Sequence, residues 1–436
     1  MPRVKTESCR MVVVAGLLLI GSLFGAACSA PATNQAPAAT GGTLFEGARL
    51  IVGDGSAPIE NAAFIVNDAH FVQIGKRGEL QVPAGAARVD LTGKTVMPAI
   101  VDAHTHQPTS TTREALVDSL QHKAYYGVAA LISLGQDPGD LAFQVRQEII
   151  PNAALFRTAG RGMTMPEPGR TDVPYWVKTE AEARKAVQEL AARKVDLVKI
   201  WVDDRDGKYQ KLGPALYGSI IDEAHKANLR VIAHIVTLED AKGLLRAGID
   251  GFAHTVGDRD IDDEFIALVK TRPNFFQEPN LPDRGVKTDL TWVSDTVPPA
   301  ELKKLQDAVA TDRPDAQRAY AIRARNLARE SKEDVLIALG TDGNVPWSHH
   351  LEMEDMVAAG MTPAQVIVAS TRNAAQVLKL TDLGTVQAGK SADFLVLNAN
   401  PLDDITNTRR IADVYLRGTA VDRAGLRARW TAKPSQ

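Results

Sequence analysis

Short runs in which apolar and polar residues alternate mark both ends of the folded part of the chain. Residues 43–96 contain TLFEGARLIVG, AAFIVND and AHFVQIG, and a similar texture returns in SADFLVLNAN at 391–400 and IADVYLRGTAVD at 411–422. Alternation of this kind is typical of strands with one buried face, and the Asp/Gly pairs between them favour tight turns. We therefore predict a small β-sandwich domain formed from both chain ends, residues 43–96 and 386–422.

Between these ends, apolar runs alternate with segments of helical pattern. The runs that we predict as strands are 96–104, 128–135, 154–160, 195–202, 229–236, 249–256, 274–280 and 334–342. Thr179 with Glu182, and Thr362 with Gln365, have the spacing of capping boxes that start helices. Eight strand–helix units over about 280 residues fit a (β/α)8 TIM-type barrel at 97–385, so the expected fold class is α/β.

One connection is longer than a barrel loop needs. It runs from Pro279 to Glu333, and its pattern predicts a helix from about Pro299 to Glu330. We interpret this stretch as an insertion near the mouth of an active site.

The first residues have the pattern of an export signal. Arg3, Lys5 and Arg10 give a basic start, and an uncharged apolar stretch follows from Met11 to Cys28. The run Gly25-Ala26-Ala27-Cys28 resembles a bacterial lipobox, which predicts a signal segment at 1–28 and lipidation of Cys28. Ordinary cleavage at Ala30-Pro31-Ala32 and a retained membrane anchor are the alternatives. Residues 29–42 read as a flexible linker, so we expect an exported bacterial protein, periplasmic or on the cell surface and lipid-anchored.

Composition excludes several classes of protein and of site. Hydrophobic residues make up 44% and charged residues 24%, which excludes long-range disorder, and the net charge of −3 gives no footprint for nucleic acid. Both cysteines, Cys9 and Cys28, precede residue 30, so a disulfide framework or a thiolate metal cluster in the body is excluded. The expected partner is a small-molecule substrate, and a homo-oligomer is compatible with the sequence.

Candidate metal ligands close several of the predicted strands. His104 and His106 are two residues apart in an extended run and can reach one ion from the same face. His234, His254 and Asp342 each end a further predicted strand, and barrel active sites lie at the carboxyl ends of the strands. Lys199 interrupts an apolar strand; an ion pair with Asp203 or Asp204 is the alternative to a functional role.

The order of these residues resembles the metal-dependent amidohydrolase superfamily. The resemblance rests on Val101-Asp102-Ala103-His104-Thr105-His106, then lysine, histidine, histidine and Gly340-Thr341-Asp342. The tail, from Gly360-Met361-Thr362-Pro363 to Ala392-Asp393, is similar to the imidazolonepropionase-related branch with prolidase-like and ochratoxinase-like enzymes. The resemblance as a whole covers about residues 43 to 422.

The resemblance implies a binuclear centre with two divalent metal ions, usually zinc. His104, His106 and Asp342 would hold the first ion, His234 and His254 the second, and Lys199 would bridge them as its carbamate. A metal-bridging hydroxide would attack the carbonyl, with Asp342 as catalytic proton shuttle. One departure is the region from Gly160 to Gly169, where relatives often carry a histidine and this chain has none.

We interpret the chain as a hydrolase that cleaves an amide C–N bond, of a dipeptide or an N-acyl amino acid. A lactonase or phosphotriesterase on the same metal centre is the first alternative, and a non-catalytic surface lipoprotein that binds metal or ligand is the second. The candidate substrate-pocket residues are Arg161, Trp292, Trp347 and His350. His122 and His225 fall in predicted helices and are interpreted as structural.

Overall fold

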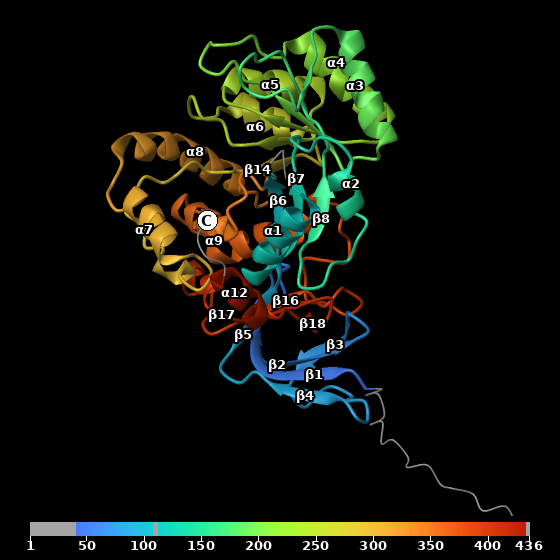
Figure 1. Cartoon of the computed structure of the whole chain (residues 1–436), viewed down its shortest axis with the longest axis vertical. Coiled ribbons are helices and arrows are strands. Elements are labelled where there is room, and N and C mark those ends of the chain that lie inside the picture. The colour runs from blue at the N-terminus through green and yellow to red at the C-terminus, as the bar shows by residue number, and fades with distance from the viewer. Residues whose placement is uncertain (1–40, 108–111, 433–436) are drawn as a thin grey trace, which may run out of the picture. The chain divides into compact units, whose positions relative to one another are not determined.

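Strands from the two ends of the chain pair in one sheet (Figure 1). The computed structural model describes residues 41–107 and 112–432. The eight-stranded sheet has the order β18-β17-β16-β5-β1-β2-β3, with β4 paired to β1. Its strands are β1 (Thr43–Leu50), β2 (Ile59–Asn67), β3 (His70–Lys76), β4 (Ala87–Asp90), β5 (Thr95–Pro98), β16 (Phe394–Leu397), β17 (Ile411–Leu416) and β18 (Thr419–Ala420).

Aromatic side chains fill the core of this sheet. The Phe394 ring stacks on Tyr415 at 4.5 Å between centroids and meets Phe45 and Phe64 edge-on at 5.2 Å. Phe71 completes the cluster at 5.7 Å from Phe394. Residues from both chain ends therefore share one apolar core. The two-layered sandwich, and the division of the chain into separate β and barrel domains, stay predictions.

The middle of the chain forms two parallel sheets. One is β6 (Ile100–Thr105), β7 (Val128–Ser133) and β8 (Leu155–Thr158). The other has the order β10-β9-β11-β12-β13-β14-β15, with β9 (Met163–Thr164), β10 (Tyr175–Trp176), β11 (Val198–Trp201), β12 (Val231–His234), β13 (Gly251–Ala253), β14 (Phe276–Glu278) and β15 (Leu336–Ile337). Each of the eight predicted strands overlaps an observed strand, and the α/β class is confirmed.

Backbone hydrogen bonds connect both edge strands of the three-stranded sheet, β6 and β8, to the longer parallel sheet. Ala103 N donates to Leu339 O at 2.9 Å, beside the carboxyl ends of β6 and β15. At the other edge, Asp196 N donates to Thr158 O at 3.1 Å, just before β11. The carboxyl ends of β6 and β15 therefore lie side by side although they are far apart in the sequence.

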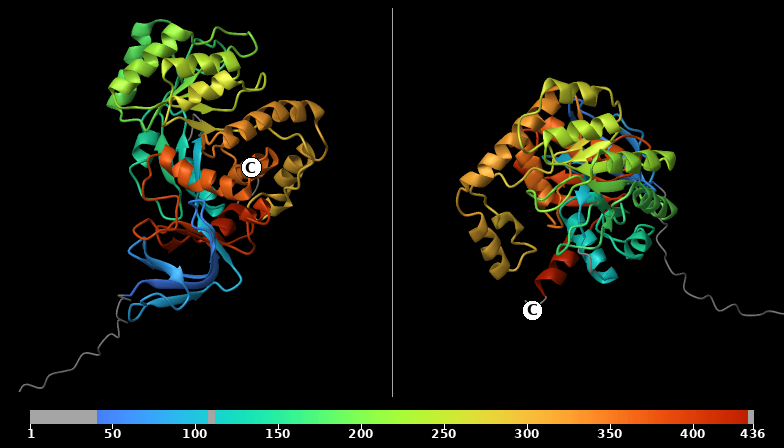
Figure 2. Two further views of the ribbon diagram at one scale, coloured as in Figure 1. Left: turned by 180° about the vertical axis from the view of Figure 1, so that it is seen from behind. Right: turned by 90° about the horizontal axis from the view of Figure 1, so that it is seen from above.

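Helices follow most of the parallel strands (Figures 1 and 2). They are α1 (Arg113–Tyr125), α2 (Leu141–Val145), α3 (Glu180–Ala192), α4 (Pro214–Lys226), α5 (Leu238–Ala247), α6 (Asp263–Lys270), α7 (Pro299–Ala308), α8 (Pro314–Lys332), α9 (Ser348–Ala358), α10 (Pro363–Val368), α11 (Ala374–Val377) and α12 (Arg423–Thr431). The predicted capping boxes at Thr179 and Thr362 are both present.

The predicted single helix from Pro299 to Glu330 was wrong in its middle. The structure has two helices, α7 and α8, separated at 309–313. Pro314 starts α8, and Arg313 before it is extended, with φ −125° and ψ 91°. A proline has no N–H and disfavours helical backbone in the residue before it, so one continuous helix cannot form here.

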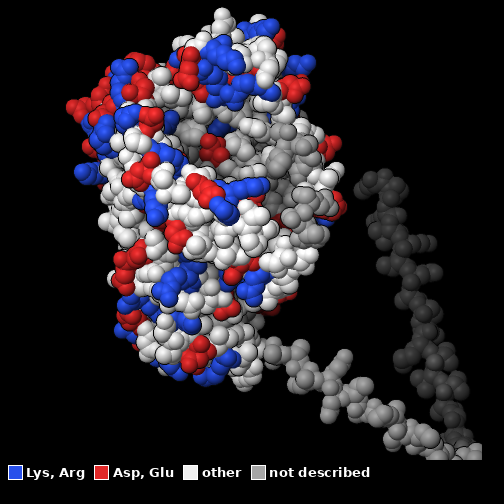
Figure 3. All heavy atoms as spheres, turned by 60° about the vertical axis from the view of Figure 1, so that its left-hand side comes forward, with Lys and Arg blue, Asp and Glu red and all other residues white. Residues whose placement is uncertain are grey.

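Three further expectations concern the signal segment, membrane-spanning helices and the charge of the surface. The signal segment, Cys28 and most of the 29–42 linker lie outside the described residues. Among the helices of the described part, none has the length and apolar character needed to cross a bilayer. On the face in Figure 3, basic and acidic side chains are interspersed, which accords with the small net charge.

Candidate metal centre

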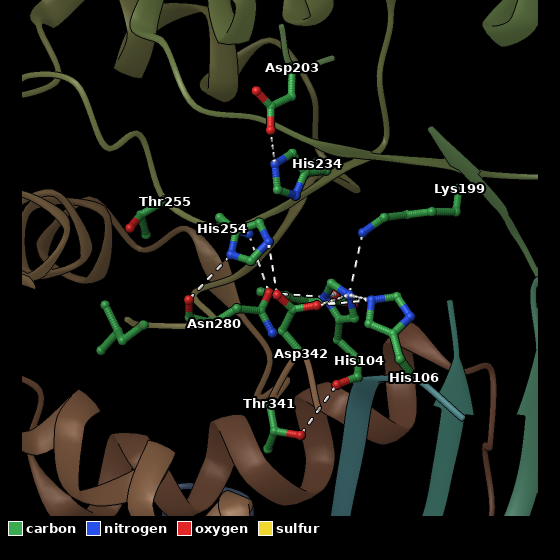
Figure 4. Close-up of polar contacts among 12 residues, drawn as sticks. His104, His106, Lys199, Asp203, His234, His254, Thr255, Asn280, Thr341 and Asp342 are labelled. Carbon is green, nitrogen blue, oxygen red and sulfur yellow. Dashed lines mark hydrogen bonds and ion pairs between the residues drawn. The ribbon is translucent and has the colours of Figure 1, made fainter. Parts of the chain in front are cut away.

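Three predicted ligands meet where β6 and β15 end. Nε2 of His104 lies 3.1 Å from Asp342 Oδ1, and Nε2 of His106 lies 2.9 Å from the same oxygen. The two imidazole nitrogens are 3.4 Å apart. One ligand atom from each residue falls within 4.8 Å of the others, as required of a shared ion (Figure 4).

These three residues fit a metal ion. Two imidazole nitrogens and one carboxylate oxygen converge on the same point, which is the arrangement that a single bound cation needs. Nδ1 of His106 and Nε2 of His254 are also buried without a hydrogen-bond partner in the described part of the chain. Imidazole nitrogen and carboxylate oxygen are donors that zinc accepts. The cluster therefore has the donor set of a metal site.

The other three predicted ligands lie around this group. Lys199 Nζ, on β11, is 3.4 Å from His104 Nε2. His254 follows β13, and its Nε2 is 3.4 Å from Asp342 Oδ2. His234 ends β12, and its ring centroid lies 4.6 Å from that of His254. The structure thus brings all the predicted ligands together, and the second ion stays a prediction.

Burial and charge determine which of these groups are ionised. Burial lowers the pKa of His106 and of His254, and it lowers the pKa of His234 to about 4, so these rings are neutral and free to bind a cation. Burial opposes ionisation of Asp342, but His104, His106 and His254 lower its pKa far more, and it is a carboxylate. For His104, burial and Lys199 are outweighed by Asp342 and Glu278, which raise its pKa.

Lys199 has no carboxylate partner in the described residues. Asp203, proposed above as an ion-pair partner, instead contacts His234 Nε2 at 3.1 Å and Arg205. Asp204 accepts a hydrogen bond from the backbone of Gly207. The lysine is fully buried, and burial lowers its pKa to about 8 against the opposing charges of Asp342 and Glu278.

Strained backbone occurs at the strand ends that form the cluster. His254, Asn280 and Asp342 have φ of 75°, 40° and 53°, in the left-handed region that disfavours side chains with a Cβ. Hydrogen bonds hold the chain there: His254 N donates to Glu278 O at 2.9 Å, and Asp342 N to His104 O at 2.8 Å. Such conformations persist only where the surroundings enforce them, and they gather at functional sites.

The sequence-based prediction did not include two polar residues that contact the predicted ligands, and it paired a third, Asp203, with Lys199 where the structure pairs it with His234. Asn280 Oδ1 lies 3.1 Å from His104 Nδ1, and Glu278 Oε2 lies 3.4 Å from the same atom. Glu278 is fully buried, and burial raises its pKa. The signal was present for Glu278, because a charged residue interrupts the apolar strand 274–280 as Lys199 interrupts its own strand.

The predicted substrate-pocket residues lie apart from the cluster or are engaged elsewhere. Trp292, Trp347 and His350 surround Tyr126, at the amino end of β7, with ring centroids 5.9, 5.8 and 6.4 Å from its ring. His350 is fully buried and contacts Thr408 Oγ1 at 3.0 Å. Arg161 donates to the carbonyls of 172–174 and stacks on Tyr175 at 4.1 Å.

Two of the remaining histidines have structural partners, as their predicted helical positions indicate. His122 on α1 stacks on Trp430 with 4.0 Å between centroids. His225 on α4 contacts Asp250 at 2.8 Å. Neither reaches the metal-ligand cluster.

The chain is similar to known proteins over most of its length. Imidazolonepropionase from Deinococcus radiodurans is 26% identical over 390 residues, covering 83% of this chain and 92% of that protein. The structure of molinate hydrolase superposes with a TM-score of 0.71 at 22% identity, covering 91% of this chain and 98% of that one. A Xaa-Pro dipeptidase with bound methionine superposes with 0.69 at 21% identity, covering 87% and 99%.

The model of the amidohydrolase family matches residues 95–421. This range runs from the start of β5 to just after β18 and includes every predicted ligand. The predictions of a hydrolytic enzyme and of its superfamily are thereby confirmed. The chain belongs to the amidohydrolase family.

Proposed function

We propose that the chain is a binuclear metal-dependent hydrolase that cleaves an amide C–N bond. The observation that carries the proposal is the convergence of His104, His106 and Asp342 on one point. Lys199 and the two further histidines, His234 and His254, lie within contact distance of this group or of each other, where a second ion would need ligands.

We propose further that the two parallel sheets are arcs of one closed barrel. The hydrogen bonds from Ala103 to Leu339 and from Asp196 to Thr158 support this, because they join both edge strands of the three-stranded sheet to the longer sheet. In this arrangement the ligand-bearing residues share the carboxyl end of the barrel, the usual place of an active site in such folds.

Bound divalent ions, most simply zinc, supply the Lewis acidity that activates water and polarises the scissile carbonyl. Asp342 then acts as the proton shuttle. Its carboxylate is ionised, and its side chain is 36% exposed, so it can both accept a proton and reach a leaving amine. This is the role expected of it from the family resemblance.

Lys199 takes part as a carbamate in this proposal. Its neutral amine would form an N–C bond with CO₂ and release one proton, which would give a carboxylate-like anion able to serve as a metal ligand. Complete burial and the absence of an ion-pair partner in the described structure support this, because a protonated lysine is costly there.

We propose an N-acyl amino acid or a dipeptide as the substrate. The relatives named imidazolonepropionase and Xaa-Pro dipeptidase support this class of C–N bond. A panel of N-acyl amino acids, X-Pro dipeptides, lactones and phosphotriesters, compared by kcat/KM, tests the proposal. Turnover confined to lactones or phosphotriesters would refute it, and no turnover by protein with two bound ions would favour a binding protein.

Metal analysis tests the centre separately. We expect close to two ions per chain, and we expect Lys199→Ala to lose metal and activity, with partial rescue by short-chain carboxylates. His225→Gln is the matched control, because His225 contacts Asp250 outside the cluster. One ion per chain in the wild type would refute the carbamate bridge.

Export and anchoring are also proposals. The basic start and the apolar stretch that ends at Cys28 support a lipid-anchored protein of the periplasm or cell surface. Cys28→Ala should move the protein from the detergent-requiring fraction to the soluble fraction of the cells that express it. An unchanged distribution would refute the lipid anchor.

A further inference from the structure

The loop that follows His254 is bound along its length by one face of α8. This loop, residues 255–262, leads from the end of β13 into α6, which begins at Asp263. Arg323, Asn326 and Arg329 on α8 are three residues apart, so their side chains lie on the same side of the helix. Each of them donates a hydrogen bond to a backbone carbonyl of the loop.

Asn326 makes the central contacts. Its Nδ2 donates to Val256 O and to Arg259 O, both at 2.9 Å, and its Oδ1 accepts from Ile261 N at 2.9 Å. The side chain is only 1% exposed. Both amide hydrogens and the carbonyl oxygen are therefore used on backbone groups of this loop, which no other side-chain type of this size would satisfy.

The two arginines hold the ends of the loop. Arg323 Nη1 donates to Thr255 O, the carbonyl of the residue after His254 (Figure 4 shows Thr255 beside it). Its guanidinium also lies against Gly257, where a Cβ would come within 2.6 Å of Nη2. At the far end, Arg329 Nη1 donates to Ile261 O at 2.8 Å, and Arg329 forms an ion pair with Asp263.

His254, the residue just before this loop, has a backbone conformation that its surroundings must maintain. His254 has φ of 75°, which its Cβ disfavours, and its Nε2 is buried beside Asp342 without a hydrogen bond. A relaxed backbone at His254 would rotate the imidazole away from the cluster. The bonds from α8 to the next residues oppose this relaxation, because they fix the carbonyls on the far side of the strained residue.

We propose that α8 acts as a clamp that sets the orientation of His254, with Arg323 and Asn326 as positioning residues for the second metal ion. The inference rests on the proposed binuclear centre. It predicts unequal effects on the two ions, because the clamp contacts the loop of His254 and makes no described contact with His104 or His106.

Asn326→Asp and Arg323→Lys test the clamp. The first keeps the acceptor for Ile261 N and turns the two donors into an oxygen that faces carbonyls; the second keeps the charge and loses the planar fork. Arg325→Ala is the matched control, because Arg325 joins the same helix to the same loop through an exposed pair with Asp260 at 2.7 Å.

The measurement is the affinity for each of two Zn²⁺ ions, by competition with a chromogenic chelator on the full-length protein, together with Co²⁺ absorption spectra. Both positioning variants should bind one of the two ions about 10–100-fold less tightly and the other as the wild type does, with an altered Co²⁺ spectrum for the weakened site. Arg325→Ala should match the wild type in both Zn²⁺ affinities and in the Co²⁺ spectrum.

Three results would overturn the inference. Wild-type affinities in both positioning variants would show that His254 does not depend on α8. An equal loss at both ions, in parallel with a lower melting temperature of the metal-free protein, would assign α8 a general structural role. A wild-type protein that binds fewer than two ions would refute the proposed centre itself, and with it the clamp.

Discussion

Glu330 on α8 is a buried acid without a partner among the described residues, and it should make the stability of the protein depend on pH. Its side chain is 0% exposed, and neither carboxylate oxygen has a hydrogen-bond partner in the described structure. Burial raises its pKa from 4.5 to about 8. The folded protein therefore keeps a proton on Glu330 at neutral pH that the unfolded chain releases.

The size of the effect follows from this difference. Stability falls wherever the folded state binds more protons than the unfolded state, so it is lost as the pH rises from about 4.5 to 8. Each pKa unit corresponds to about 1.4 kcal/mol, which gives a loss of about 3 kcal/mol between pH 5 and pH 8. Glu330→Gln cannot ionise and should not show this loss.

Urea unfolding of wild type and Glu330→Gln at pH 5 and pH 8 measures it. The free energy of unfolding of Glu330→Gln minus that of wild type should be larger at pH 8 than at pH 5 by about 3 kcal/mol, because only the wild type loses stability over this range. Glu301→Gln, at an exposed position on α7, should follow the wild type at both pH values. A relative stability of Glu330→Gln that does not change with pH would refute the reasoning.

Three further predictions concern packing, capping and metal. Phe394→Ala, at the centre of the aromatic cluster, should lower the free energy of unfolding by about 3–5 kcal/mol in urea, and a loss below 1 kcal/mol would contradict its central place. Thr179→Ala should cost about 1 kcal/mol and Thr179→Ser almost nothing, since serine keeps the cap of α3. Removal of metal by a chelator should lower the melting temperature, and added Zn²⁺ should restore it; a chelated protein with unchanged melting temperature would contradict a bound ion.

Much of the candidate site could be predicted because its ligands end apolar strands. Parallel strands place their carboxyl ends together. Histidine and aspartate residues at the ends of different strands are therefore expected to lie close to one another, even when the packing is not known. Two of these ligands, His104 and Asp342, come from β6 and the end of β15, which the structure joins by backbone hydrogen bonds. Lys199 stood out for a related reason, as a charge within an apolar run.

The rest depends on packing between distant segments. Nothing local indicates that Glu278 and Asn280 meet His104, because β14 and β6 are not paired strands and their approach depends on how the two parallel sheets pack. Trp292, Trp347 and His350 follow or precede strand ends in the sequence, yet the chain folds them around Tyr126 at the amino end of β7. Position along the chain alone could not distinguish the carboxyl ends of the strands, where the predicted metal ligands lie, from their amino ends.

The shared sheet at the chain ends has a consequence for the order of folding. β5 pairs with β16 across about three hundred intervening residues. During synthesis, the edge of β5 that pairs with β16 therefore stays unpaired until nearly the whole polypeptide has been made. Phe394 enters the aromatic core only at that moment. Until residues 394–416 leave the ribosome, β5 presents an unpaired edge to other chains, a known route to aggregation. A chain cut shortly before Phe394 would keep that edge open, whereas a tag added after Gln436 would not.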